Sequence, residues 1–191
     1  MVPQRSQSRT SESVRWVHAN PLSAEKDVLV DANIFFAIGH PTNPQYARFR
    51  SAVRNAGVVV KLPQRVIGEL GGSDTERVRT AIDEGWAEII DAPAPTDGDA
   101  VAASDIAMRT IAAETDQPEH EVEKTDAILA GLVVQYVRDR STRGVIVLTD
   151  DQPARKGIKN AVTAQGYTDA ISVYGLADII GDDPGDSMRL I

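Results

Sequence analysis

The sequence predicts an α/β fold of three layers, α/β/α, with a central parallel sheet between helices. Short apolar runs alternate with segments of helical periodicity along most of the 191 residues. This spacing favours parallel pairing, because parallel strands need a crossover connection that a helix usually supplies. Acidic residues follow several of the apolar runs, and ligand sites in such folds form at the carboxyl ends of the strands.

Five short runs have the composition of strands. They cover residues 28–31, 58–61, 87–91, 144–149 and 170–174. Each is rich in Val or Ile and is followed by a segment of different periodicity. The sheet is therefore expected to have five strands.

Helical patterns lie between these runs. The pattern at 44–57 has a proline at its start and a glycine after its end, as helices prefer. The pattern at 63–72 also starts at a proline, and it stops at two glycines. Further patterns cover 74–85, 98–116, 118–139 and 152–165.

The chain is expected to form one domain with a polar extension at each end. Residues 1–26 lack periodicity and predict a flexible N-terminal arm. Residues 27–180 predict the folded domain, of ordinary size, and residues 181–191 predict a loosely ordered tail. No apolar stretch has the length of a membrane span and the N-terminus lacks a secretory signal, so a cytoplasmic location without a membrane partner is expected.

The composition limits the kinds of site. The chain has no cysteine and three histidines, so a thiolate nucleophile or a histidine-rich zinc site is not expected. A metal would be held mainly by oxygen, which favours Mg²⁺ or Mn²⁺. The net charge of −8 argues against bulk attraction of nucleic acid. The excess of Arg (15) over Lys (5), and of Asp (18) over Glu (10), resembles proteins from salt-loving microbes.

Five acids lie beside or just after apolar runs: Asp31, Glu69, Asp126, Asp150 and Asp151. Taken singly, each has a structural explanation, either as a helix N-cap or as an exposed helix residue. As a set they are harder to explain, because carboxylates brought together repel one another. Divalent cations would supply the missing counter-charge. The set therefore predicts a metal site at the carboxyl edge of the sheet.

Such a site suits the hydrolysis of phosphodiester bonds. A metal-bound water can be activated as hydroxide, and a second ion can stabilise the leaving oxygen. The sequence has no glycine-rich phosphate loop of the GxxxxGK type and no GxSxG elbow. A hydrolysis without a covalent intermediate is therefore expected.

At these residues the chain resembles the PIN-domain ribonuclease family, which includes the VapC toxins of toxin–antitoxin pairs. The matching pieces are the apolar run with Asp-Ala-Asn at 28–33, an acid after the second strand, Asp-Ala-Ile-Leu-Ala at 126–130 and Val-Leu-Thr-Asp-Asp at 147–151. The resemblance covers roughly residues 27–175. It implies endonucleolytic cleavage of RNA that depends on Mg²⁺ or Mn²⁺.

The resemblance also implies roles for single residues. The residues that it assigns to catalysis and metal binding are Asp31, Glu69, Asp126 and Asp151. Asp150 is a neighbouring acid that would bind metal or substitute for Asp151. Asn33 and Thr149 match supporting positions, and Asn33 would orient Asp31 by a hydrogen bond.

Partners follow from the same resemblance. Arg65, one turn before Glu69, is the basic residue expected to contact RNA. In a toxin, an antitoxin protein would occupy the acidic groove, and a homodimer is a further expected assembly. Segments 74–84 and 98–124 are longer than in compact toxin members. The acids around His120, including Glu123, predict a solvated helix face.

The alternative function is a non-catalytic PIN-like module that binds RNA or a protein partner. A phosphatase or phosphotransfer domain of similar topology fits less well. A haloacid-dehalogenase type would have DxD after the first strand, whereas position 33 is Asn. A response regulator would have its acid pair near the first strand, whereas the Asp-Asp pair comes late in this chain.

Overall fold

The fold is that of a computed structural model, which describes residues 20–139 and 143–181. Most of the predicted arm (1–19) and of the predicted tail (182–191) lies outside the described residues. The division of the chain at 26 and 180 therefore stays a prediction. The described end of the arm contacts the domain, since Leu22 is buried in the core and the Asn20 side-chain amide donates to the Ala52 carbonyl at 2.9 Å.

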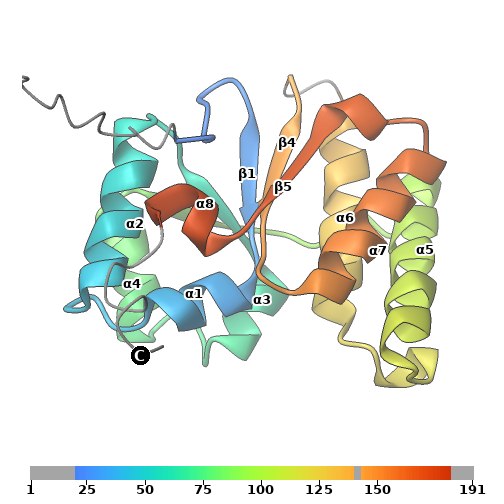
Figure 1. The fold of residues 1–191 in the computed structure, drawn as a ribbon, viewed down its shortest axis with the longest axis horizontal. Coiled ribbons are helices and arrows are strands. Elements are labelled where there is room, and N and C mark those ends of the chain that lie inside the picture. Colours follow the sequence, from blue (N-terminus) through green and yellow to red (C-terminus); the bar gives the residue numbers. More distant parts are fainter. Residues whose placement is uncertain (1–19, 140–142, 182–191) are drawn as a thin grey trace, which may run out of the picture.

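A sheet of five parallel strands forms the centre of the molecule (Figure 1), as the sequence predicts. The strands are β1 (Asp27–Val30), β2 (Val60–Pro63), β3 (Ala87–Ile90), β4 (Val145–Leu148) and β5 (Ile171–Tyr174). Their order across the sheet is β3-β2-β1-β4-β5, and every neighbouring pair is parallel.

Helices cover both faces of the sheet and complete the three layers (Figure 1). One face carries α1 (Ala32–Ile38), α2 (Pro44–Asn55), α3 (Gln64–Glu69), α4 (Glu76–Asp83) and α8 (Leu176–Ile180). The other face carries α5 (Gly98–Thr115), α6 (Lys124–Arg138) and α7 (Gln152–Ala164). Two 3₁₀ turns are η1 (Glu119–Glu121) and η2 (Thr168–Ala170). In the part of the chain that the structure describes, no helix is both long enough and apolar enough to span a membrane.

The core divides at the sheet because successive side chains of a strand point to opposite faces. On β1, Val28 and Val30 pack with the α1–α4 side, whereas Leu29 packs with α5–α7. On the first side, the buried Trp86 ring lies 5.8 Å from that of Phe35, centroid to centroid. Both faces of the central strands are buried, as expected for a parallel sheet between helices.

The order of the strands creates a switch point between β1 and β4. From β1 to β3 the connections run over one face, and from β3 through β5 they run over the other. Val30 pairs with Leu148 at the end of these two strands, and the Asp31 amide donates to the Leu148 carbonyl at 3.0 Å. Ligand sites of open α/β sheets form at such points. The residues that follow β1 and β4 therefore lie side by side.

Close packing of α6 on α5 places the N-terminal end of α6 at the same edge. A Cβ atom at Gly131 of α6 would lie 2.8 Å from the Ala100 carbonyl oxygen of α5. Small buried residues, Ala103 and Ala107, line the same side of α5. The two helices can therefore approach closely, which holds Asp126 near the end of β1.

Three local features differ from the prediction. The short helices α1 and α8 were not predicted, because five to seven residues are too few to show a helical period. The predicted helix at 118–139 is divided, since Val122 has an extended backbone (φ −66°, ψ 135°) between η1 and α6. This break turns the start of α6 towards the carboxyl edge.

Candidate functional site

Asp31 lies at the end of β1, where it caps α1 and is nearly buried, with 5% of its surface exposed. One carboxylate oxygen, Oδ1, accepts the Ala32 amide at 2.6 Å. The other, Oδ2, accepts from Asn33 Nδ2 at 2.6 Å and from Thr149 Oγ1 at 2.7 Å. Asp31 is therefore a helix N-cap, the structural explanation that the sequence offers for it. Its second oxygen is also fixed, by the hydrogen bonds from Asn33 and Thr149.

Asn33 and Thr149 join the ends of β1 and β4. Thr149 is fully buried, and its hydroxyl also accepts from Asn33 Nδ2 at 2.9 Å. The side-chain oxygen of Asn33, Oδ1, accepts the Asp150 amide at 3.1 Å. These bonds restrict the Asp31 carboxylate to one orientation, and the bond from Asn33 is the one that the resemblance implies.

A pocket of about 200 Å³ opens beside Asp31. Its lining residues are Asp31, Ala32, Asn33, Phe36, Glu69, Glu123, Asp126 and Asp151. The structure thus brings together the four acids predicted to be catalytic. They come from the ends of β1 and α3, the first turn of α6 and the start of α7.

Local contacts position the two exposed acids of this group. Glu69, the last residue of α3, accepts a hydrogen bond from the Thr125 hydroxyl in the first turn of α6. Asp151 caps α7, and its Oδ1 accepts the Ala154 amide at 2.7 Å. Neither carboxylate is therefore free to turn at random.

Asp150 is not brought to the pocket. Its Oδ1 accepts the Leu176 amide at 3.1 Å and lies 3.7 Å from Arg155 Nη2. The side chains of Asp150 and Asp151 thus diverge after β4, and only Asp151 lines the pocket.

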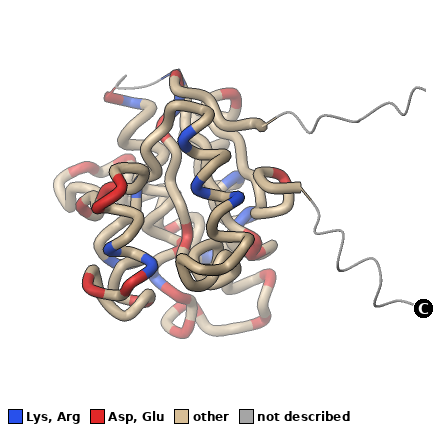
Figure 2. The backbone as a smooth tube through the Cα atoms, turned by 90° about the vertical axis from the view of Figure 1, so that its left-hand side faces the viewer, with Lys and Arg blue, Asp and Glu red and all other residues tan. Residues whose placement is uncertain are grey.

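Arg65 is exposed on α3, one turn before Glu69. Its side chain makes no hydrogen bond or ion pair with other described residues, and the predicted contact with RNA stays a prediction. Figure 2 shows both acidic and basic positions along the backbone of the described residues.

Glu123 and Thr125 belong to this site and were not predicted. Glu123 occupies the N-cap position of α6 without a capping hydrogen bond from its side chain. It is exposed, as the sequence interpretation expected, and it also lines the pocket. Its spacing of three residues before Asp126 is the signal for a shared side of the helix. His120 is a surface residue as predicted, with 80% of its side chain exposed.

The pocket raises the pKa of two of its acids. Burial, followed by the charges of Glu69 and Asp151, raises the pKa of Asp31 to about 6, against the lowering effect of its hydrogen bonds from Thr149 and Ala32. Burial and then the charges of the neighbouring acids, Asp31 first, raise the pKa of Asp126 to about 8. Among the described residues, no Lys or Arg forms an ion pair with the carboxylates of this pocket, and so their repulsion is not balanced.

The carboxylate oxygens of this pocket are of the type that binds hard divalent cations. In residues 20–139 and 143–181, no three His, Asp or Glu side chains stand in the arrangement of a complete metal site. Five carboxylates nevertheless line one pocket, and all their donors are oxygen, as Mg²⁺ and Mn²⁺ prefer. Burial first, and then the neighbouring negative charges, raise the pKa of Asp31 and Asp126, and a proton or a cation can balance these charges.

A comparison with protein families matches residues 24–188 to the model of the halobacterial PIN domain. The chain belongs to the PIN-domain family. No curated protein matches the sequence. The PIN domain is a nuclease-type domain, and the description of the family agrees with a composition that resembles proteins from salt-loving microbes.

A second hollow of about 410 Å³ extends the site of this PIN domain. It shares Glu123, Asp126 and Asp151 with the first pocket. Its other lining residues, from α5, η1 and the start of α7, are Ile111, Thr115, Gln117, Glu121, Val122 and Pro153. The acids therefore lie along an open surface that can take an extended substrate.

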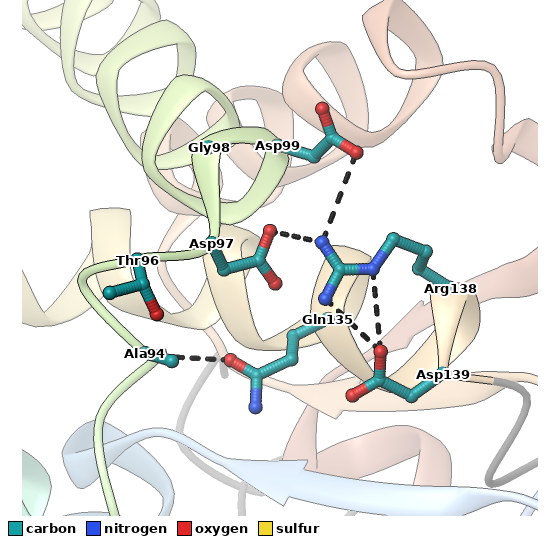
Figure 3. A pocket seen from close by; sticks show the side chains of 8 residues that line it. All are labelled: Ala94, Thr96, Asp97, Gly98, Asp99, Gln135, Arg138 and Asp139. Atoms are coloured by element: carbon teal, nitrogen blue, oxygen red, sulfur yellow. Dashed lines mark hydrogen bonds and ion pairs between the residues drawn. The ribbon is translucent and has the colours of Figure 1, made fainter.

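A separate pocket of the PIN domain, of about 300 Å³, lies at the other end of α6 (Figure 3). There Asp97 caps α5, accepting the Ala100 amide at 3.1 Å, and accepts a further hydrogen bond from Arg138. Arg138 also pairs with Asp139 at 3.1 Å. Burial alone would raise the pKa of Asp97, but the hydrogen bonds from Arg138 and Ala100 lower it below its ordinary value. This pocket contains none of the predicted site residues.

Proposed function

We propose that this PIN domain is an endoribonuclease that hydrolyses RNA phosphodiester bonds with Mg²⁺ or Mn²⁺. The observation that carries the proposal is the pocket in which Asp31, Glu69, Asp126 and Asp151 converge without a basic partner among the described residues. A fold gains no stability from such a group, and a cation would balance it.

Some residues of the pocket would bind the cation, and others orient the carboxylates that bind it. Asp31, Glu69, Asp126 and Asp151 would hold the cation, which when bound supplies an activated water and charge for the leaving oxygen. Thr149 and Asn33 keep the Asp31 carboxylate in one orientation. Thr125 does the same for Glu69. Such fixed oxygens suit a reaction whose main requirement is alignment of water and phosphate.

Because the chain is acidic overall, we expect its contacts with RNA to be made by single basic residues near the pocket. A net charge of −8 gives no general attraction for phosphates. Arg65, exposed on α3 near Glu69, is the basic residue that we expect to contact the strand.

The test is cleavage of labelled single-stranded RNA with and without Mn²⁺, at fixed salt. We expect Asp31→Asn to reduce cleavage by more than the 10- to 100-fold that is typical when an outer-shell partner is lost. Asp105→Asn, which removes an exposed carboxylate of α5 outside the pocket, should cleave as the parent does. Equal cleavage by the parent and Asp31→Asn would end the proposal.

Thermal melting tests the metal independently of cleavage. A ligand at about 100 times its dissociation constant stabilises the folded state by about 2.7 kcal/mol. For a domain of this size that raises the melting temperature by roughly 5–10 °C. No rise with millimolar Mn²⁺ or Mg²⁺ would contradict metal binding at the pocket.

A toxin of a toxin–antitoxin pair is the narrower form of this proposal. It requires an antitoxin that covers the acidic pocket, and a basic side chain would complement the unbalanced carboxylates there. We expect a short upstream reading frame to encode a protein that co-purifies with the chain and blocks cleavage. Size-exclusion chromatography of the two proteins would also test the expected homodimer.

A further inference from the structure

We propose that Phe36 is a platform on which one base of single-stranded RNA stacks beside the acidic pocket. The inference rests on the proposed ribonuclease function and names its substrate class more closely. Phe36 lies on α1, lines the pocket together with Asp31 and Glu69, and has 52% of its surface exposed.

The exposure of Phe36 has no explanation in the packing of the fold. The other two phenylalanines, Phe35 and Phe49, are completely buried and stack or pack against Trp86. Among the described residues, the other exposed large hydrophobics, Val59, Ile89 and Val101, are aliphatic and do not line the acidic pocket. The exposed aromatic ring is therefore placed where a substrate would pass.

Arg77 of α4 holds the ring in position. Its guanidinium carbon lies 5.2 Å from the centroid of the Phe36 ring, and its Nη1 donates to the Phe35 carbonyl at 3.4 Å. This cation–π contact restrains the ring and leaves half of its surface open. It also places a positive charge beside a ring that lines the acidic pocket.

The chemistry favours an unpaired base over other ligands. Bases stack on aromatic rings with little dependence on sequence, because every base has a π face. In a duplex the bases are stacked on each other and inaccessible, so the ring can act only on single-stranded or splayed nucleotides. An uncharged contact also suits a site with carboxylates, since it attracts the strand without opposing the cation. The nucleotide next to the cleaved bond is thus held by its base.

The test measures binding of fluorescent single-stranded RNA by anisotropy, in the Asp31→Asn background so that cleavage does not interfere. Phe36→Leu keeps an apolar side chain and removes the ring, and we expect it to weaken binding about tenfold. Phe36→Trp should bind at least as tightly as the parent, and its indole fluorescence should fall on addition of RNA. Val101→Ala, which truncates an exposed apolar residue outside the pocket, is the matched control.

A second RNA separates stacking from a general effect. For an oligonucleotide of the same length made of abasic nucleotides, Phe36→Leu and its parent should bind equally. If both proteins bind the ordinary RNA equally, or if the indole fluorescence of Phe36→Trp is unchanged by RNA, the inference is overturned. The ring would then be a contact for a protein partner, and Mn²⁺-dependent cleavage by the wild type would still stand. Failure of the proposed ribonuclease function would appear differently, as the absence of Mn²⁺-dependent cleavage by the wild-type protein.

Discussion

Acidic side chains near the two ends of α6 lie in opposite electrostatic settings: Asp97, the cap of α5, and Asp126, in the first turn of α6. At the C-terminal end, Asp97 is buried against Arg138, and the guanidinium and the Ala100 amide lower its pKa. At the N-terminal end, Asp126 lies among other carboxylates, and burial and their charges raise its pKa to about 8. Helix caps occur at both ends, so the difference is the presence or absence of a basic partner.

This difference separates a structural role from a functional one. The charge of Asp97 is balanced inside the fold, which lets it cap α5 and join two helices. The charges around Asp126 can be balanced only from outside the described chain, by protons or by a cation. We therefore expect the protein without a bound cation to be less stable than its packing allows.

The largest expected effect is on the pH dependence of stability without metal. Asp31 has a folded-state pKa of about 6, against 3.8 unfolded, so the folded state binds more protons between these values. The free energy of unfolding should then fall as pH rises from about 4 to 8, with about 3 kcal/mol from Asp31 alone. Melting curves in EDTA at fixed salt should show a decrease of roughly 6–12 °C from Asp31, and Asp126, whose pKa is also raised, adds to it. Saturating Mn²⁺ should abolish most of it, and a metal-free profile that rises over this range would contradict the comparison.

Thr149→Val tests whether the orientation of Asp31 matters. The change keeps the size of the buried side chain and removes the hydroxyl that donates to Asp31 Oδ2. We expect a 10- to 100-fold loss of metal affinity or cleavage, as for other outer-shell partners. Titration of Mn²⁺ against the melting temperature gives the affinity separately from cleavage. Thr110→Val on α5, which removes a hydroxyl bonded to the Ile106 carbonyl, is a matched control outside the pocket.

Neutralising one acid at each end of α6 should change stability in opposite directions. Asp126→Asn removes an unbalanced charge and should stabilise the metal-free protein at pH 8 by about 1 kcal/mol or more. Asp97→Asn weakens the hydrogen bond with Arg138 and should destabilise it by about 1 kcal/mol.

Urea unfolding with and without Mn²⁺ gives both values. Asp126→Asn should also lose the stabilisation by metal, whereas Asp97→Asn should retain it. If both variants were destabilised equally and both responded to metal, the two ends of the helix would be equivalent and the comparison would fail.

The sequence predicted the sheet and the four converging acids, because both depend on patterns that are local to each segment. Strand composition and the helices between them limit the topology to parallel pairing, and this brings the residues after β1 and β4 together. The direction of a side chain in a turn has no such pattern. Asp150 and Asp151 are neighbours of the same type, and only the backbone after Leu148 decides which one lines the pocket. Glu123 and Phe36 were missed for a similar reason, since Glu123 depends on where α6 begins and Phe36 lies on the short helix α1.

The smallest expected effect distinguishes the two acids after β4. Asp150→Asn keeps an oxygen for the Leu176 amide and loses only a pair with Arg155 at 3.7 Å, so stability should change by less than about 0.5 kcal/mol. The rise in melting temperature with Mn²⁺ should be unchanged. Asp151→Asn keeps a good helix cap, because Asn caps as well as Asp, but it should lose most of that rise.

If both variants lost the metal response equally, Asp150 and Asp151 would contribute equally to metal binding, and Asp151 alone would not be the fourth acid. The variants remove the same charge from adjacent positions, so general electrostatic attraction of the cation falls by a similar amount in each. A difference between them therefore reports which carboxylate faces the pocket.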